Sequence, residues 1–201
     1  MTIVQKILQL DKELFKLINY TWHNSFFDFL MPWLRDAEMW APLYFFLILL
    51  MAINYKRQGW WWIAFFISTV VITNYVSSNL IKGNIARVRP CSNPEFAGWI
   101  RILVGYIPMN SSFVSSHAAN HFGLAVFSYL TLRNQFGKWM LLFFLWAFLI
   151  SYAQIYVGVH YPTDVLGGTI VGLLIGYITA KLFNKYFGLQ QHSAEAFVAF
   201  N

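Results

Sequence analysis

The chain has 201 residues, of which 58% are hydrophobic and only 11% are charged, and this balance excludes an ordinary soluble domain and indicates an integral membrane protein. The formal charge of +6 does not indicate a nucleic-acid partner, because the Lys and Arg residues stand mostly at the ends of apolar runs. The single cysteine, Cys91, can form no disulfide within the chain. We expect one domain over residues 1–201 and no cleaved signal peptide.

Residues 1–38 contain no convincing membrane span. Apolar residues recur at helical spacing between residues 3 and 22, with Lys6, Asp11 and Lys12 among them, which predicts an amphipathic helix at the membrane interface. The segment FFDFLMPWL that follows contains Asp28 and Pro32 and is too short to cross a bilayer alone. We therefore expect residues 26–34 to form a re-entrant or surface segment.

Five uncharged apolar windows follow, at residues 39–55, 59–81, 118–132, 139–159 and 165–180. Each is long enough, or nearly so, to span a bilayer. The third and fifth windows are short, and we expect both helices to begin a few residues earlier at a polar cap. The expected fold is all-α: a polytopic bundle of about five transmembrane helices over residues 39–183, with the interfacial N-terminal segment before it.

Basic residues set the expected orientation. They follow the first, third and fifth windows, as Lys56 and Arg57, Arg133 and Lys138, and Lys181 and Lys185. By parity these positions share one side of the membrane, and the positive-inside rule makes that side cytoplasmic. The loop 82–113, the start of the third helix and the turn between the last two helices then share the outer face, most simply of a bacterial inner membrane.

Three segments at that face carry residue types that bind or attack phosphate. In KGNIARVRP, Lys82 and Arg89 are seven residues apart, which places them on one side of a helix that Pro90 ends. In FVSSHAAN, Ser115 or Ser116 would cap the third helix and leave its N–H groups free for an anion. Taken singly, the basic pair could only mark a membrane end and the serines could be ordinary caps.

The third segment, IYVGVHYPTD, places Asp164 in the first turn of the last helix, close to His160. A carboxylate that accepts from one imidazole nitrogen leaves the other free to attack. Together with His117, the three segments suit metal-free phosphoryl transfer, in which one histidine attacks phosphorus and the other protonates the leaving oxygen. Asp164 read alone could be only a helix cap.

Two other interpretations remain. His117 and His121 could join His160 and Asp164 as Zn ligands, although His121 fits an interhelical hydrogen bond better. In the second interpretation, the protein binds or transports a lipid phosphate and does not hydrolyse it efficiently. We assign no role to the two remaining histidines, His23 and His192.

The three segments, at 82–90, 114–117 and 154–164, resemble in order and spacing the signature motifs of the type 2 phosphatidic acid phosphatase superfamily. The resemblance implies that His160 becomes a phosphohistidine, that Asp164 orients it and that His117 is the general acid. It further implies no metal or cofactor, inhibition by vanadate, and a set of phosphate ligands at Lys82, Arg89, Ser115 and the backbone N–H of Ser116.

Two departures from the motifs stand out. Val114 and Ser116 replace the proline and glycine of the usual Pro-Ser-Gly-His. Ala153 and Gln154 occupy the positions of the usual Ser-Arg, and Gln154 can donate to a phosphate oxygen but carries no charge.

The missing cation could come from Arg87 or Arg101, which are both expected on the outer loop. We expect an enzyme that hydrolyses a phosphomonoester or diphosphate of a membrane lipid at the outer leaflet. Undecaprenyl diphosphate is the first substrate expected, and phosphatidylglycerophosphate, phosphatidic acid and lipid A phosphate remain open, because the motifs contact the phosphate and not the tail.

Overall fold

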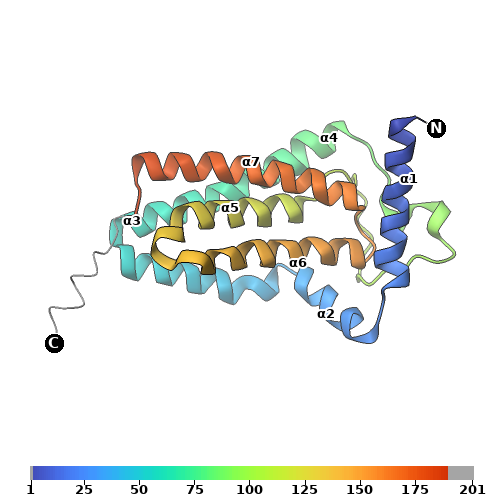
Figure 1. The fold of residues 1–201 in the computed structure, drawn as a ribbon, viewed down its shortest axis with the longest axis horizontal. Helices are drawn as coiled ribbons and strands as arrows, with labels where there is room; N and C mark the ends of the chain where they lie inside the picture. The colour runs from blue at the N-terminus through green and yellow to red at the C-terminus, as the bar shows by residue number, and fades with distance from the viewer. Residues whose placement is uncertain (1, 190–201) are drawn as a thin grey trace.

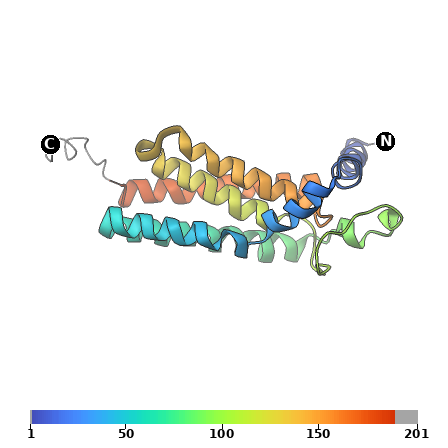
Figure 2. The ribbon, with the colours of Figure 1, turned by 90° about the horizontal axis from the view of Figure 1, so that it is seen from below.

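A computed structural model describes residues 2–189, so His192 lies outside the described residues. Three continuous helical stretches in it are long and apolar enough to cross a membrane, at Glu38–Asn84, Ser116–Tyr156 and Pro162–Tyr186. They lie side by side in one elongated bundle, which Figures 1 and 2 show from two directions. The first two stretches each fold back on themselves.

Helix α3 (Ala41–Tyr75) reverses at Lys56, whose φ of 46° is not helical. Its two arms pack so closely that a Cβ at Gly59 would lie 1.9 Å from the carbonyl oxygen of Met51. The second arm continues through η3 (Val76–Ile81) into α4 (Lys82–Asn84). The chain reverses again at Gly137, with φ 60°, between α5 (Ser116–Phe136) and η6 (Gly137–Leu141), which leads into α6 (Leu142–Tyr156).

With α7 (Pro162–Tyr186), five segments therefore run along the bundle, and the prediction of an all-α polytopic fold is confirmed. The two short windows also begin where a polar cap was expected. Ser115 caps α5 and accepts from the N–H of Ala118. Pro162 opens α7, where the Asp164 carboxylate accepts from the N–H of Tyr161 at 2.8 Å.

Glycines bring α5 and α7 into direct backbone contact. A Cβ added to any of the three would lie 2.3 Å from a carbonyl oxygen of α5 or its cap: Gly168 from Ser115, Gly172 from Ala119 and Gly176 from Gly123. Small residues allow such close approach between membrane helices. The contact holds the two helix N-termini together, and the N–H of Ser115 donates to the carbonyl of Asp164 at 2.9 Å.

The N-terminal segment covers one end of the bundle. Helix α1 (Ile3–Lys16) begins at a capping box on Thr2 and runs crosswise over that end (Figures 1 and 2). Its outward face carries exposed apolar side chains such as Ile3, Val4 and Ile7, as expected for an amphipathic helix. Its inward face buries Phe15 against Tyr161 and, contrary to the sequence pattern, also buries Asp11.

Residues 26–34 lie within α2 (Ser25–Arg35), which begins at the Asn24 cap and contains Pro32. The helix packs on the same end of the bundle, where Met31 contacts the cluster of Ala153 and Tyr156 from α6. A short helical turn, η2 (Glu38–Trp40), then leads into α3. The basic residues Lys56 and Arg57 lie at the opposite end, where α3 reverses.

Candidate active site

The three sequence segments meet beneath α1 and α2, at the covered end of the bundle. They enclose a cavity of about 240 Å³ whose walls include Lys82, Arg89, Ser116, His117, Gln154 and His160. Residues as far apart in the chain as Lys82 and His160 thus share one space, because α5 and α7 begin at the same end of the bundle at which the second arm of α3 finishes.

The segment between Lys82 and Arg89 differs from the prediction. The helix ends at Asn84, and the chain is extended at Ile85 and Arg89 rather than helical. The backbone N–H of Arg87 donates to the hydroxyl of Ser111, and its carbonyl accepts from the N–H of Ser112 at 2.9 Å. This pairing with residues 111 and 112 replaces the helical hydrogen bonds, and Lys82 and Arg89 still line one cavity.

Arg89 is buried and held on every side. A guanidinium has five N–H donors, and those of Arg89 have five acceptors: the carbonyls of Asn110, Ser111 and Val159, Oδ1 of Asn110 and Nε2 of His160. Burial lowers its pKa from the ordinary arginine value, which still leaves the side chain charged at neutral pH. It is therefore a fixed positive charge beside His160.

His160 occupies the turn between α6 and α7. Gly158, with φ 91°, makes this turn possible, since a Cβ there would lie 2.6 Å from the carbonyl oxygen of Arg101. Nε2 lies 3.2 Å from Nη1 of Arg89, and Nδ1 lies 3.4 Å from Oδ2 of Asp164. Because Arg89 can only donate, Nε2 carries the lone pair and Nδ1 carries the proton.

The environment keeps His160 neutral. Burial lowers its pKa to about 4, and the positive charges of Arg89 and Lys82 act in the same direction, whereas Asp164 raises the pKa by less than burial lowers it. At neutral pH the imidazole is therefore uncharged, with an unprotonated Nε2 that faces Arg89 at the edge of the cavity.

Asp164 is itself held by several donors. Its carboxylate accepts from the Ser112 hydroxyl, from the N–H of Tyr161 and, at 2.5 Å, from Nη1 of Arg87. The Asp164 side chain is fully buried, and these donors and His160 are its polar neighbours. A carboxylate with this many donors keeps one orientation.

Arg87 and Arg101, the two additional phosphate contacts offered by the sequence, are both paired with carboxylates. Arg87 points behind Asp164, where it also pairs with Asp11 at 2.6 Å, and Arg101 pairs with Asp28 at 2.5 Å. Neither arginine lines the cavity that holds His160. Each lies beside a carboxylate that neutralises it, which no local sequence pattern could indicate.

His117 lies in the first turn of α5 and lines the cavity. Its carbonyl accepts from Nδ1 of His121 at 2.8 Å, and Nε2 of His121 lies 3.3 Å from the Tyr44 hydroxyl. His121 thus makes the interhelical hydrogen bond expected from the sequence. Within residues 2–189, no group of three His, Cys, Asp or Glu side chains is arranged to hold a metal ion.

The two serines of the second segment face different ways. The Ser115 hydroxyl is buried and accepts from the N–H of Ala118 within its own helix, so its side chain does not face the cavity. Ser116 does line the cavity, and its hydroxyl lies 2.9 Å from that of Ser78. Of the two predicted serine ligands, only Ser116 lines the cavity with its side chain.

Gln154 also lines the cavity. It is completely buried, and both its amide nitrogen and its amide oxygen lack a hydrogen-bond partner within the described chain. A buried amide without partners costs free energy unless something binds it. The orphaned amide therefore indicates a polar ligand in this cavity.

Sequence reasoning missed two contributions of the N-terminal segment. Arg35, the last residue of α2, lines the same cavity with Tyr106. Asp11 reaches the back of the site from α1 and accepts from the N–H and hydroxyl of Thr163 as well as from Arg87. In the sequence both residues look like ordinary surface charges. Only their contacts with distant residues show that they belong to the site.

The cavity combines three cations, the N-terminus of α5 and a neutral histidine with an unprotonated Nε2. Such a set binds a tetrahedral oxyanion and places a nucleophile against it. Next to it, a groove of about 420 Å³ runs between α3 and α5, with His117 at its polar end and side chains such as Phe66, Ile67 and Val71 along its walls. An acyl or prenyl tail suits this groove.

Comparison with known proteins agrees with this geometry. Residues 62–187 match the PAP2 superfamily. The chain is 29% identical to a lipid A 4'-phosphatase of Porphyromonas gingivalis over 90% of its own length and 75% of the relative's, and 31% identical to an undecaprenyl-diphosphatase of Sulfolobus acidocaldarius over 85% and 77%. The crystal structure of Aquifex aeolicus LpxE superposes with a TM-score of 0.65 at 28% identity, covering 86% of this chain and 95% of that one.

Proposed function

Since the chain belongs to the PAP2 superfamily and is a membrane phosphatase of lipid phosphate esters, we propose that it works through a phosphohistidine on His160 at the outer face of a bacterial inner membrane. One observation carries the proposal. His160 lines the cavity with Nε2 3.2 Å from Nη1 of Arg89 and Nδ1 3.4 Å from Oδ2 of Asp164, which assigns the proton to Nδ1 and the nucleophilic electron pair to Nε2.

In the proposed first step, Nε2 of His160 attacks phosphorus while Lys82 and Arg89 face the phosphoryl oxygens. The P–N bond forms as the bond from phosphorus to the leaving oxygen breaks, and protonated His117 gives its proton to that oxygen. Asp164 compensates the positive charge that develops on the imidazole of His160. The Ser116 hydroxyl and the orphaned amide of Gln154 add uncharged hydrogen bonds to the phosphoryl group.

In the second step, water attacks the phosphohistidine. His117, now neutral, takes a proton from this water, the P–N bond breaks, and the electron pair returns to Nε2 of His160. Inorganic phosphate and the original protonation states result. The cation-lined cavity serves both steps, because each passes through a transition state with similar charge on the phosphoryl oxygens.

The placement in the membrane rests on the two ends of the bundle. Basic residues cluster at the end opposite the cavity, which supports a cytoplasmic location for that end and an outward-facing site. The exposed apolar face of α1 supports its position at the membrane surface beside the site. A lipid tail can then lie in the groove between α3 and α5 while its phosphate reaches His160.

We propose undecaprenyl diphosphate as the first substrate, on the strength of the relative named an undecaprenyl-diphosphatase. Lipid A phosphate is the second candidate, favoured by a specific feature. A polar chamber of about 400 Å³ adjoins His117 and Arg35, and it has room for a sugar head group that a bare diphosphate does not need. The relative named a lipid A 4'-phosphatase agrees with this candidate.

The test is phosphate release by the full chain in detergent with chelator present, using four lipids in parallel: undecaprenyl diphosphate, lipid A, phosphatidylglycerophosphate and phosphatidic acid. His160→Ala should abolish release, and His23→Ala, which changes an exposed histidine of the N-terminal segment, should not affect it. Acid-labile radiolabel retained on the wild-type protein and absent from His160→Ala would identify the intermediate. Substantial release by His160→Ala would overturn the covalent mechanism.

A further inference from the structure

The cavity offers few charged donors that are free to move onto a phosphoryl group. All five N–H donors of Arg89 already have acceptors, and four of those are carbonyl or amide oxygens that fix the side chain. Only the N–H that faces Nε2 of His160 borders the reaction path. Gln154, which also lines the cavity, contributes hydrogen bonds but no charge.

We propose that Arg35, carried by the helix that precedes the first transmembrane segment, is a catalytic residue that binds the phosphoryl oxygens and supplies the cation absent at Gln154. The inference rests on the proposed function. It concerns a residue outside the three sequence motifs and outside the range 62–187 that matches the family.

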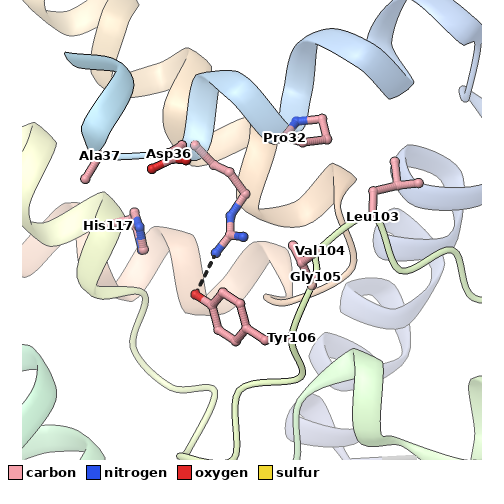
Figure 3. Close-up of a pocket in the computed structure, with 9 residues that line it drawn as sticks. Pro32, Asp36, Ala37, Leu103, Val104, Gly105, Tyr106 and His117 are labelled. Atoms are coloured by element: carbon pink, nitrogen blue, oxygen red, sulfur yellow. Dashed lines mark hydrogen bonds between the residues drawn. The ribbon is translucent and has the colours of Figure 1, made fainter. Parts of the chain in front are cut away.

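Arg35 borders two spaces at once. It lines the cavity that contains His117, Gln154 and His160, and it also lines the adjoining polar chamber. Figure 3 shows His117 and Tyr106 bordering that chamber. Arg35 is therefore within reach of a phosphate in the cavity and of a head group in the chamber.

The guanidinium of Arg35 is loosely held, unlike that of Arg89. Within the described residues it donates one hydrogen bond, from Nη2 to the Tyr106 hydroxyl at 3.5 Å, which is drawn as the dashed line in Figure 3. Its carbon lies 5.8 Å from the centre of the Tyr106 ring. Its buried Nε has no hydrogen-bond partner within residues 2–189. A donor without a partner is available to a ligand that enters the cavity.

Charge pairing separates Arg35 from Arg87 and Arg101. Arg87 and Arg101 are each within 2.5 Å of a carboxylate oxygen, whereas no carboxylate of the described residues lies within 4.0 Å of Arg35. A guanidinium without a counterion beside an anion site attracts the anion, and its planar fork fits two phosphoryl oxygens. The fork also suits the charge that grows on these oxygens in the transition state.

The position of Gln154 provides a sharp test. An arginine placed at 154 would enter the same cavity from α6, so it could replace the charge that Arg35 supplies from α2. The two positions should therefore be coupled. The cost of removing Arg35 should be large when residue 154 is glutamine and small when it is arginine.

The experiment measures kcat/KM for phosphate release by wild type, Arg35→Met, Gln154→Arg and the double variant. We expect Arg35→Met to lower kcat/KM by about 100-fold, the order found for removing one donor to a transition state. In the Gln154→Arg background the same change should cost less than about tenfold. Arg57→Met, at the opposite end of the bundle, is the matched control and should behave as wild type.

Vanadate binding, measured by calorimetry, separates this inference from the proposed function. If wild type releases no phosphate from any lipid, the proposed function fails, and weaker vanadate binding by Arg35→Met than by Arg57→Met still supports the role of Arg35. Equal cost of Arg35→Met in both backgrounds, or wild-type activity and vanadate affinity in Arg35→Met, would overturn the inference. If Gln154→Arg does not fold, Arg35→Lys decides the question. Partial activity and partial vanadate affinity in Arg35→Lys would support the inference, and values equal to those of Arg35→Met would overturn it.

Discussion

Asp11→Asn tests whether the N-terminal helix holds the catalytic carboxylate in place. Asp11 is buried and accepts from the N–H of Thr163 at 2.8 Å and from Nη2 of Arg87 at 2.6 Å. Arg87 in turn donates to Asp164 at 2.5 Å. Asparagine keeps the size of the side chain, but its amide can offer an oxygen to Thr163 or to Arg87 and not to both, and it carries no charge.

The magnitude follows from the burial of the pair. Breaking a fully buried ion pair costs about 3–5 kcal/mol. The Arg87 side chain is 20% exposed and keeps Asp164 as a partner, so we expect a smaller loss of about 2 kcal/mol in the free energy of unfolding. Without its ion pair to Asp11, the Arg87 guanidinium shifts relative to Asp164, and the Asp164 carboxylate then orients His160 less well. We expect kcat to fall about tenfold, equivalent to about 1.4 kcal/mol in the activation barrier.

Both quantities can be measured on the purified full chain in detergent, as denaturant unfolding and as phosphate release at saturating lipid. Glu13→Gln is the matched control: it makes the same kind of change two residues away, at an exposed position where the carboxylate accepts from the Gln9 amide. The control should leave both quantities unchanged. Wild-type kcat and stability in Asp11→Asn would refute the link from α1 to Asp164.

Two further predictions concern other parts of the site. His117→Ala should abolish turnover of lipid phosphates, whose leaving groups need a proton, and should impair p-nitrophenyl phosphate much less; equal losses on both substrates would contradict a role as general acid. Gly172→Ala should lower the free energy of unfolding by about 2 kcal/mol, because its Cβ would lie 2.3 Å from the carbonyl oxygen of Ala119. Gly98→Ala is the control and should be neutral, since its Cβ meets nothing within 4 Å. Equal stability of the two variants in denaturant would count against the close packing of α5 and α7.

The sequence was sufficient for the features that depend on local pattern. Apolar windows and their polar caps give the five crossing segments, since a bilayer demands long uncharged helices whose backbone groups bond internally. Parity then brings the three motifs to one end without any knowledge of packing. His117, His160 and Lys82 were placed together by this reasoning, and they line one cavity.

The errors arose where a distant segment competes with a local preference. Residues 85–89 could have continued the helix, but pairing of Arg87 with Ser111 and Ser112 draws them into an extended conformation. Arg87 itself looked like a free cation until Asp11, 76 residues earlier, proved to be its partner. Neither contact leaves a trace in hydrophobic periodicity, since both depend on how α1 lies across the bundle.

The position of α1 also determines how the chemistry relates to the membrane. The helix exposes apolar side chains such as Ile3 and Ile7 on one face, while its other face delivers Asp11 to the pair that holds Asp164. Moving α1 away from the bundle would therefore break the buried ion pair between Asp11 and Arg87, which lies behind Asp164 and His160. The bundle alone therefore supplies His160, the proposed nucleophile, and two cations. The N-terminal segment supplies the carboxylate behind Asp164 and, as we infer, the third cation at Arg35.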